Sequence, residues 1–250
     1  MGAKKDKKRA LVLGGSCQLA LRLIPCLVSK QIQPLVTYRT LKAKAAIQTE
    51  LAANKDKITL INVDLTDPDT LLNLEDALKQ GVDYLVDFAH SDYECLVAGA
   101  KDTAIYEYFN ANISVRTMVL KRVARCMLTN RFGRLVFISS TAAKHPNPGQ
   151  GFYAASKAAA EALYRNLGLE MASKGITTAI LRPGFANFGR GQRYLKLQHQ
   201  RLDQLKKKGR IITPDALNNA ILFLLAVADN SINGTVLTLD GGMTIGKTSL

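Results

Sequence analysis

Short apolar runs alternate with helical patterns along nearly the whole chain, and this alternation constrains the fold more than any other feature. Each apolar run of strand length is followed by a segment in which apolar residues recur with helical spacing. The expected strands are 9–15, which ends in a glycine pair, 34–38, 58–63, 82–89, 134–139, 177–181 and 235–239. The expected helices are 19–27, 41–51, one that begins at Asp67-Pro68, 104–126, one through Tyr153, and 214–228. This pattern predicts one parallel, doubly wound α/β sheet of about seven strands flanked by helices.

Length and composition indicate a single domain. With 250 residues and no internal repeat, we expect a basic N-terminal arm at 1–9 and one domain at 10–250. The longest apolar run, 221–228, is far short of the roughly 20 residues of a membrane span, so no span is expected. The arm lacks the apolar core of a signal peptide, which favours the cytoplasm. The four cysteines have no paired metal-ligand spacing, so we expect reduced thiols and no metal site.

Positive charge is concentrated in two places. The chain has 34 Lys and Arg against 20 Asp and Glu, for a formal charge of +14. Part of the excess lies in the arm, and part lies in 190–212, which we interpret as a substrate loop or lid. Such runs are commonly solvated surface, but they also suit an acidic carrier protein, a phosphate-bearing substrate or nucleic acid. The sequence contains no nucleic-acid-binding motif, so nucleic acid is not expected as a partner.

Tyr153 and Lys157 carry the clearest chemical signal. They are four residues apart in an alanine-rich helical segment and therefore share one helix face. A phenol with a pKa near about 10 exchanges its proton at neutral pH only if a nearby cation stabilises the phenolate. Lys157 is that candidate cation, and such a pair suits the protonation of a carbonyl oxygen during its reduction. Ser140 follows an expected strand, at the sheet edge where parallel α/β folds bind ligands.

The first and second expected strands predict a dinucleotide site. Gly14 begins the turn between the first strand and helix, where a backbone can approach a pyrophosphate. Arg39 follows the second strand, at 39 − 20 = 19 residues beyond Ala20, near the position where an acid would bind the ribose of NAD. An arginine there suits the 2′-phosphate of NADP, although it is also consistent with an ordinary surface residue. Asn112 lies inside an expected helix, in which asparagine is a poor helix former; an exposed, tolerated residue is the alternative.

These residues together resemble the short-chain dehydrogenase/reductase family over nearly the whole chain. Ser140 precedes Tyr153 by 153 − 140 = 13 residues, Lys157 follows it by four, and Asn112 precedes it by 153 − 112 = 41. The resemblance implies a Rossmann-like fold in which Tyr153 is the general acid, Ser140 polarises the substrate oxygen and Lys157 lowers the pKa of the phenol. It also implies that Asn112 holds a water of the proton relay.

The resemblance further implies that the cofactor is NADP(H). The implied cofactor-binding residues are Gly14, Ser16, Cys17, Gln18, Leu19, Arg39, Asp64, Leu65, Ala89, His90, Tyr153, Lys157, Pro183 and Gly184. The chain departs from the family pattern where the Asn-Asn-Ala-Gly tetrapeptide reads Asp87-Phe88-Ala89-His90 and where Phe188 replaces a threonine.

Within the family, the chain most resembles β-ketoacyl-(acyl carrier protein) reductases and polyketide ketoreductases. This implies reduction of a β-ketoacyl thioester on an acyl carrier protein or CoA, carrier docking at Arg131 and Lys174, and a homo-oligomer, either tetramer or dimer. The alternatives are a reductase of a free small carbonyl or alcohol, an enoyl reductase, and a non-catalytic binding subunit with an altered cofactor turn. The three-residue gap between Tyr153 and Lys157 favours ketone reduction over enoyl reduction.

Overall fold

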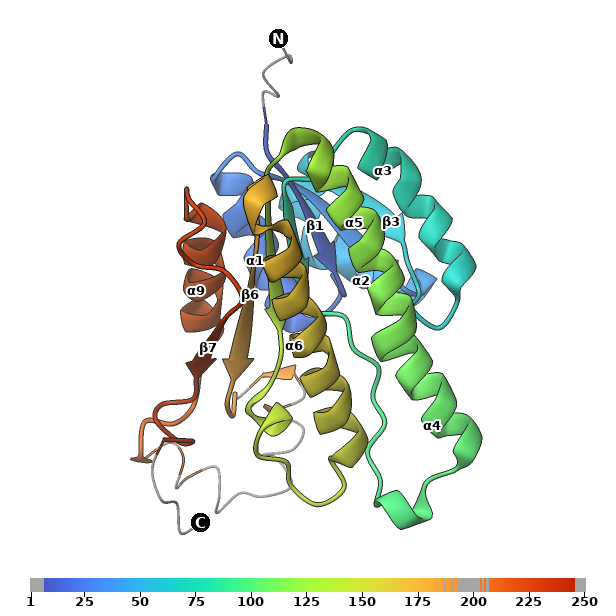
Figure 1. Cartoon of the computed structure of the whole chain (residues 1–250), viewed down its shortest axis with the longest axis vertical. Coiled ribbons are helices and arrows are strands. Elements are labelled where there is room, and N and C mark those ends of the chain that lie inside the picture. The colour runs from blue at the N-terminus through green and yellow to red at the C-terminus, as the bar shows by residue number, and fades with distance from the viewer. Residues whose placement is uncertain are drawn as a thin grey trace.

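The strands of the computed structural model form one seven-stranded parallel sheet, as the sequence predicts. The structure describes residues 7–186, 188–189, 191–192, 203, 205 and 207–245. The strand order is β3-β2-β1-β4-β5-β6-β7 (Figure 1). The strands are β1 (Arg9–Leu13), β2 (Gln33–Tyr38), β3 (Thr59–Asn62), β4 (Tyr84–Asp87), β5 (Gly133–Ile138), β6 (Ile176–Pro183) and β7 (Thr235–Leu239). Every predicted strand is present, with ends that differ by at most two residues.

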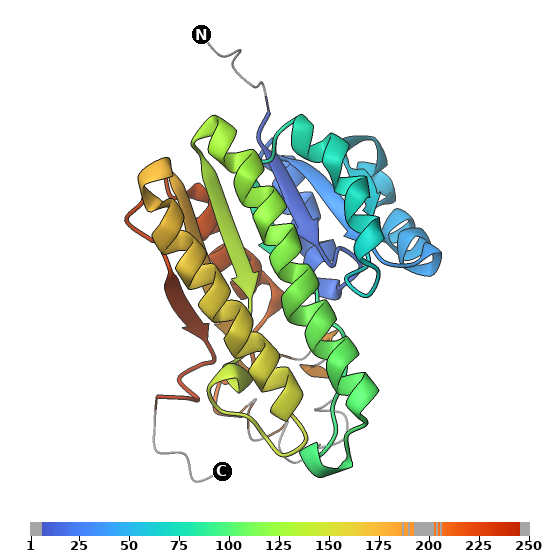
Figure 2. The same cartoon turned by 45° about the vertical axis from the view of Figure 1, so that its right-hand side comes forward.

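Helices cover both faces of the sheet (Figures 1 and 2). The α-helices among the described residues are α1 (Gln18–Ser29), α2 (Leu41–Glu50), α3 (Glu75–Lys79), α4 (Asp102–Phe109), α5 (Arg116–Asn130), α6 (Gly151–Met171) and α9 (Pro214–Ala226). The helix predicted from Asp67-Pro68 begins as the 3-10 helix η2 (Pro68–Leu74) and continues as α3. None of the described helices has the length and apolar composition needed to cross a bilayer.

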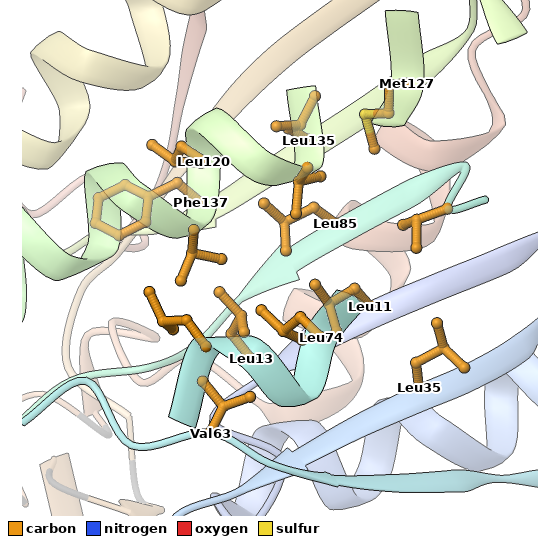
Figure 3. Close-up of a cluster of buried hydrophobic side chains, with 14 of the residues drawn as sticks. Leu11, Leu13, Leu35, Val63, Leu74, Leu85, Leu120, Met127, Leu135 and Phe137 are labelled. Atoms are coloured by element: carbon orange, nitrogen blue, oxygen red, sulfur yellow. The ribbon is translucent and has the colours of Figure 1, made fainter. Parts of the chain in front are cut away.

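The alternation of side chains along β1 divides the core into two layers. Leu11 and Leu13 point to the face that α5 and α6 cover, where a buried cluster extends across the sheet to Phe137 (Figure 3). Ala10 and Val12 point to the opposite face and pack in a second cluster with residues of α1 and α9. Both faces of a parallel sheet are buried in this way, which explains why its strands read as continuous apolar runs.

The sheet reverses its direction of growth at β1, which pairs with β2 on one side and β4 on the other. The chain first builds outward through β2 and β3 and then returns to build β4 to β7 on the other side. The carboxyl ends of β1 and β4 therefore border the crevice in which open α/β sheets bind ligands.

The long helix predicted over 104–126 is interrupted. α4 ends at Phe109, a π-helical turn, η4, spans Asn110–Val115, and α5 continues from Arg116. Asn112 lies in this turn and is only 1% exposed, so the alternative of an exposed, tolerated asparagine is wrong. π-turns place an extra residue in a helix and frequently occur at functional sites.

The first strand includes a residue that the sequence assigned to the basic arm. Arg9 begins β1 and is buried, because its backbone pairs with β2 and its guanidinium donates to carbonyls of Ala77 and Gly81. The arm therefore ends at Lys8 rather than at Arg9.

Candidate active site

A cleft of about 420 Å³ lies at the carboxyl ends of β1 to β4. Seven of the predicted cofactor-binding residues line it: Gly14, Ser16, Arg39, Asp64, Leu65, Ala89 and His90. Asn112 closes the same cleft from the π-turn. Residues that are up to about a hundred positions apart in the chain therefore share one wall, because the parallel strands bring their carboxyl ends to one edge.

The turn after β1 lies close to the end of β4. Gly14 has a φ of +73°, and a Cβ on it would lie 2.8 Å from the nitrogen of Ala89, so only glycine fits there. Cys17 caps α1, with its Sγ accepting from the nitrogen of Ala20 at 3.4 Å. Burial raises the pKa of the Cys17 thiol to about 11, so this cap is neutral near pH 7. The first turn of α1 carries no acidic residue, which leaves its N–H groups suited to an anion.

Arg39 is exposed at the cleft, between β2 and α2. Thr40 caps α2 by accepting from the nitrogen of Ala43, and the first turn of this helix contains no acid. The same turn carries Lys42 and Lys44. This wall of the cleft is thus cationic, as a phosphate group requires.

Tyr153 and Lys157 lie one turn apart on α6. The Lys157 Nζ is 5.9 Å from the centre of the Tyr153 ring and donates to the carbonyl of Ile138 at 2.7 Å. Lys157 is 4% exposed, whereas Tyr153 is half-buried. Because the ammonium group has little access to water, its field acts on the phenol with little screening.

Ser140 follows β5 and begins the short turn Thr141–Ala143, against which α6 packs. Its Oγ accepts from the nitrogen of Ala142 at 3.1 Å. A hydroxyl has one proton and two lone pairs, so this bond leaves the Ser140 proton available to a substrate oxygen.

Asn112 makes four hydrogen bonds. Its Nδ2 donates to Ser91 Oγ at 2.5 Å and to the carbonyl of Tyr108 at 2.8 Å, and its Oδ1 accepts from the backbone N–H of Ser91 at 3.3 Å. Its backbone carbonyl accepts from Arg116 Nε at 2.9 Å. Arg116 takes one lone pair of that backbone carbonyl, and a carbonyl oxygen has two. A relay water would use the other as its acceptor.

A buried ion pair that the sequence did not predict supports this arrangement. Arg116 and Asp87 form the pair, and Tyr164 donates to Asp87 Oδ2 at 2.9 Å. Burial alone would lower the pKa of the Arg116 guanidinium, but the Asp87 carboxylate outweighs it and the pKa is raised. Burial also raises the pKa of Tyr164 well above its ordinary value. The sequence feature that could have indicated this ion pair is Arg116, a charged residue on the apolar face of a predicted helix.

A second buried carboxylate lies one turn beyond Lys157. Glu161 Oε1 accepts from Ser139 Oγ at 2.6 Å and from Arg182 Nε at 2.7 Å. The hydrogen bond to Glu161 raises the pKa of the Arg182 guanidinium. α6 is thereby tied to the ends of β5 and β6, which holds Tyr153 and Lys157 in place.

His90 extends from the cleft to the catalytic tyrosine. Its ring packs edge-on against the Tyr153 ring, with centroids 4.8 Å apart, and its Nε2 lies 3.1 Å from the hydroxyl of Tyr108. Tyr108 is also 3.1 Å from Ser156 Oγ. Sequence reasoning assigned no role to Tyr108 or Ser156. For Ser156, the available signal was its position between Tyr153 and Lys157 on the same helical turn.

Several predicted residues lie away from the cleft wall. Pro183 and Gly184 end β6, and Gly184 donates its N–H to the carbonyl of Leu239. Cys17, Gln18 and Leu19 lie at the start of α1, where Gln18 accepts from the nitrogen of Gly189. The interpretation of 190–212 as a lid concerns a segment in which 190, 193–202, 204 and 206 lie outside the described residues.

Arg131 and Lys174 lie beside each other but at the amino edge of the sheet. Arg131 donates to the carbonyl of Ser173, next to Lys174, just before β5 and β6 begin. Tyr153 is near the start of α6 and Lys174 follows its end, so at 1.5 Å per residue the two are about 30 Å apart along the helix. Within one chain, the predicted carrier contacts and the candidate site are therefore at opposite ends.

The residues of the cleft fit a dinucleotide phosphate. The cleft combines a glycine turn that leads into α1, the Ser16 hydroxyl and the Arg39 guanidinium, and its end at His90 contacts Tyr153. A parallel α/β fold with a phosphate-binding crevice and a Ser, Tyr and Lys set at its carboxyl edge defines the class of dinucleotide-dependent dehydrogenases.

Comparison with known proteins gives the family. Residues 8–196 match the family model described as short chain dehydrogenase, so the chain belongs to that family. It is 30% identical over 244 residues to a 3-oxoacyl-(acyl-carrier-protein) reductase of Buchnera aphidicola, which covers 96% of this chain and 98% of the relative. It is 29% identical over 241 residues to the Escherichia coli enzyme of the same name, covering 95% and 98%.

Solved structures show the same fold. ElxO with NADP bound superposes with a TM-score of 0.85 at 23% identity and covers 96% of this chain and all of that one, 100%. A variant of the actinorhodin polyketide ketoreductase with NADPH gives 0.85 at 22% identity, covering 96% and 98%.

Proposed function

We propose that this protein is an NADPH-dependent ketoreductase that reduces a β-ketoacyl thioester, bound to an acyl carrier protein or CoA, to the β-hydroxyacyl form. The observation that carries the proposal is the pairing of Tyr153 with the buried Lys157, 5.9 Å from its ring, next to the Ser140 turn. The similarity to reductases named for the 3-oxoacyl carrier-protein substrate supports the choice of substrate class.

Each residue has a defined task in this reaction. Tyr153 donates its proton to the ketone oxygen, and Lys157 stabilises the phenolate that remains. Ser140 donates a hydrogen bond to the same oxygen, since its Oγ accepts only the Ala142 N–H among the bonds given above. Asn112 offers a carbonyl lone pair to a water that restores the Tyr153 proton. NADPH bound in the cleft would supply the hydride.

The cationic wall supports NADPH over NADH. Arg39 is exposed at the cleft, and the first turn of α2 carries Lys42 and Lys44 and no acid. A 2′-phosphate is stabilised there, whereas the ribose hydroxyls of NADH find no carboxylate on this turn.

The carrier contacts at Arg131 and Lys174 remain part of the proposal. Because they lie at the opposite edge from the site in one chain, they suit a carrier that serves the site of another subunit in a homo-oligomer. Both are exposed cations that suit an acidic surface.

The test is an assay of NADPH oxidation with one acyl group presented on carrier protein, on CoA and as a short free thioester. We expect turnover with carrier or CoA substrates and a loss of about 10³-fold or more in Tyr153→Phe. Tyr106→Phe, an exposed tyrosine on α4, is the matched control and should keep full activity. Activity retained in Tyr153→Phe would overturn the mechanism. Equal kcat/KM for a free small ketone would instead favour the alternative substrate class, and absence of NADPH binding by calorimetry would favour a non-catalytic subunit.

A further inference from the structure

His90 occupies a position where the resembling family has glycine, and it brings an aromatic ring between the cleft and Tyr153. The two rings meet edge to face, with centroids 4.8 Å apart and an interplanar angle of 77°. Edge-to-face contacts are favourable beyond the apolar area that they bury, so this one favours a single orientation of the phenol.

The hydrogen bonds behind His90 determine its tautomer. Ser156 Oγ donates its single proton to the carbonyl of Tyr153 at 2.9 Å. The bond between Ser156 and Tyr108 therefore uses the Tyr108 proton, with Ser156 as the acceptor. The Tyr108 oxygen is then the acceptor from His90, so neutral His90 carries its proton on Nε2.

This chain of bonds starts and ends on the same turn of α6. It runs from the Tyr153 carbonyl through Ser156 and Tyr108 to His90, whose ring returns to the Tyr153 side chain. Tyr108 is 4% exposed and Ser156 is 2% exposed, so the inner members are shielded from water. A closed circuit with buried inner members restrains the two half-buried side chains in it, His90 and Tyr153.

We propose that His90 is a positioning residue: held through Tyr108 and Ser156, its imidazole fixes the Tyr153 phenol in the orientation that protonates the substrate oxygen. The proposal rests on the proposed function for its kinetic consequence. A misplacement of about 1 Å at a reacting group costs up to about 10²-fold in rate, so a loose phenol is expected to lower turnover markedly.

The kinetic test compares His90→Gly, His90→Gln, Tyr108→Phe and the double variant His90→Gly/Tyr108→Phe, with Tyr106→Phe as control. We expect His90→Gly to lower kcat about tenfold while the KM for the thioester changes less than twofold. Glutamine can still donate to Tyr108 but has no ring, so His90→Gln should show a similar loss. Tyr108→Phe should lose comparably, and the double variant should lose no more than either single variant, since both act through one circuit.

Three kinetic results would overturn the proposal. These are wild-type kcat in His90→Gln, multiplicative losses in the double variant, or an effect confined to the dissociation constant of NADPH. The last result would make His90 a cofactor contact only.

A second measurement needs neither cofactor nor activity. In protein labelled with ¹³Cζ-tyrosine, the Tyr153 signal is assigned by its absence in Tyr153→Phe. We expect it to shift or broaden in His90→Gly and Tyr108→Phe, and to stay unchanged in Tyr106→Phe. An unchanged signal in both His90→Gly and Tyr108→Phe would overturn the positioning role, whatever the enzyme reduces. Conversely, if the protein shows this shift but has no reductase activity, the proposed function is wrong and the positioning role of His90 stands.

Discussion

At the amino edge of the sheet, buried cations bind backbone carbonyls, whereas at the carboxyl edge the buried Lys157 lies beside a phenol. Arg134 donates to the carbonyls of Gly175, Val227, Ala228 and Asp229, and Arg9 donates to those of Ala77 and Gly81. Burial lowers the pKa of both guanidinium groups. Lys157 donates to the carbonyl of Ile138, and its Nζ lies 4.8 Å from the centre of the Phe137 ring and 5.9 Å from that of the Tyr153 ring.

The difference shows how one sheet separates stability from chemistry. A carbonyl is a fixed acceptor that joins the end of one element to another, so the amino-edge arginines tie loops to the sheet. A phenol can gain or lose a proton, so a lysine beside it can influence proton transfer, as the proposed function requires of Lys157. Two ion pairs are structural exceptions at the carboxyl edge. Asp87–Arg116 holds the carbonyls of Ala89 and Asn112 in place, and Glu161–Arg182 ties α6 to β6.

The largest effect is expected at Lys157. Lys157→Met removes the cation that stabilises the phenolate, so kcat should fall by about 10³-fold, within the range for acid–base groups. The free energy of unfolding should fall by no more than about 2 kcal/mol, for the lost bond to Ile138. Steady-state kinetics and urea unfolding measure the two, with the exposed Lys121→Met as control. If more than a tenth of the activity survived, the assignment of Lys157 would be wrong.

At the amino edge, Arg134→Met should mainly lower the free energy of unfolding and leave kcat nearly unchanged. Removing a guanidinium that is itself 3% exposed leaves several part-buried carbonyls without their donor, and we expect a loss of about 3 kcal/mol in the free energy of unfolding. The kcat of the folded variant should stay within twofold of wild type. The exposed Arg165→Met is the matched control, with an expected change below about 0.5 kcal/mol. A large fall in kcat at unchanged stability would break the contrast between the two edges.

Arg39 should have a smaller effect, confined to the cofactor. Arg39→Asp places a negative charge where a 2′-phosphate would bind, so the dissociation constant of NADPH should rise about tenfold or more. That of NADH should change less than threefold. Fluorescence titration with both cofactors measures the ratio, and equal weakening of the two would remove Arg39 from cofactor selection.

The smallest effect is expected from the exposed cations at the amino edge. In Arg131→Glu/Lys174→Glu, the KM for a carrier-bound substrate should rise about fivefold, because rim charges mainly change association. The KM for the CoA-bound substrate should not change, since CoA has no acidic protein surface. A loss of equal size for both substrates would indicate damage to the fold rather than a docking surface.

Much of this arrangement could be predicted from local sequence. The apolar runs from Arg9 to Leu239 yielded all seven strands, because most strand positions are apolar and the inner strands are buried on both faces. The spacing of Tyr153 and Lys157 yielded their shared helix face, since one helical turn fixes it. The order β3-β2-β1-β4-β5-β6-β7 places Ser140 and Gly14 at one edge, as the carboxyl ends of parallel strands require.

Other features depend on partners that are distant in the chain. The sequence shows Asp87 as a substituted motif position and Arg116 as a charge in a helix, but their pairing requires β4 and α5 to pack. The π-turn at Asn112 arises because Ser91, Tyr108 and Arg116 offer it more bonds than a regular helix would. The spacing of apolar residues does not record these side-chain bonds, so it predicted an uninterrupted helix.

The sequence by itself determined the strand and helix order, the edge at which the chemistry lies and the residue types of the proton-transfer set, because these depend on backbone geometry and on spacings of a few residues. Only the tertiary structure decided which buried charges serve stability and that His90 reaches Tyr153, because those contacts join residues on different elements. It also decided that Arg131 and Lys174 lie about 30 Å along α6 from the site they were predicted to serve.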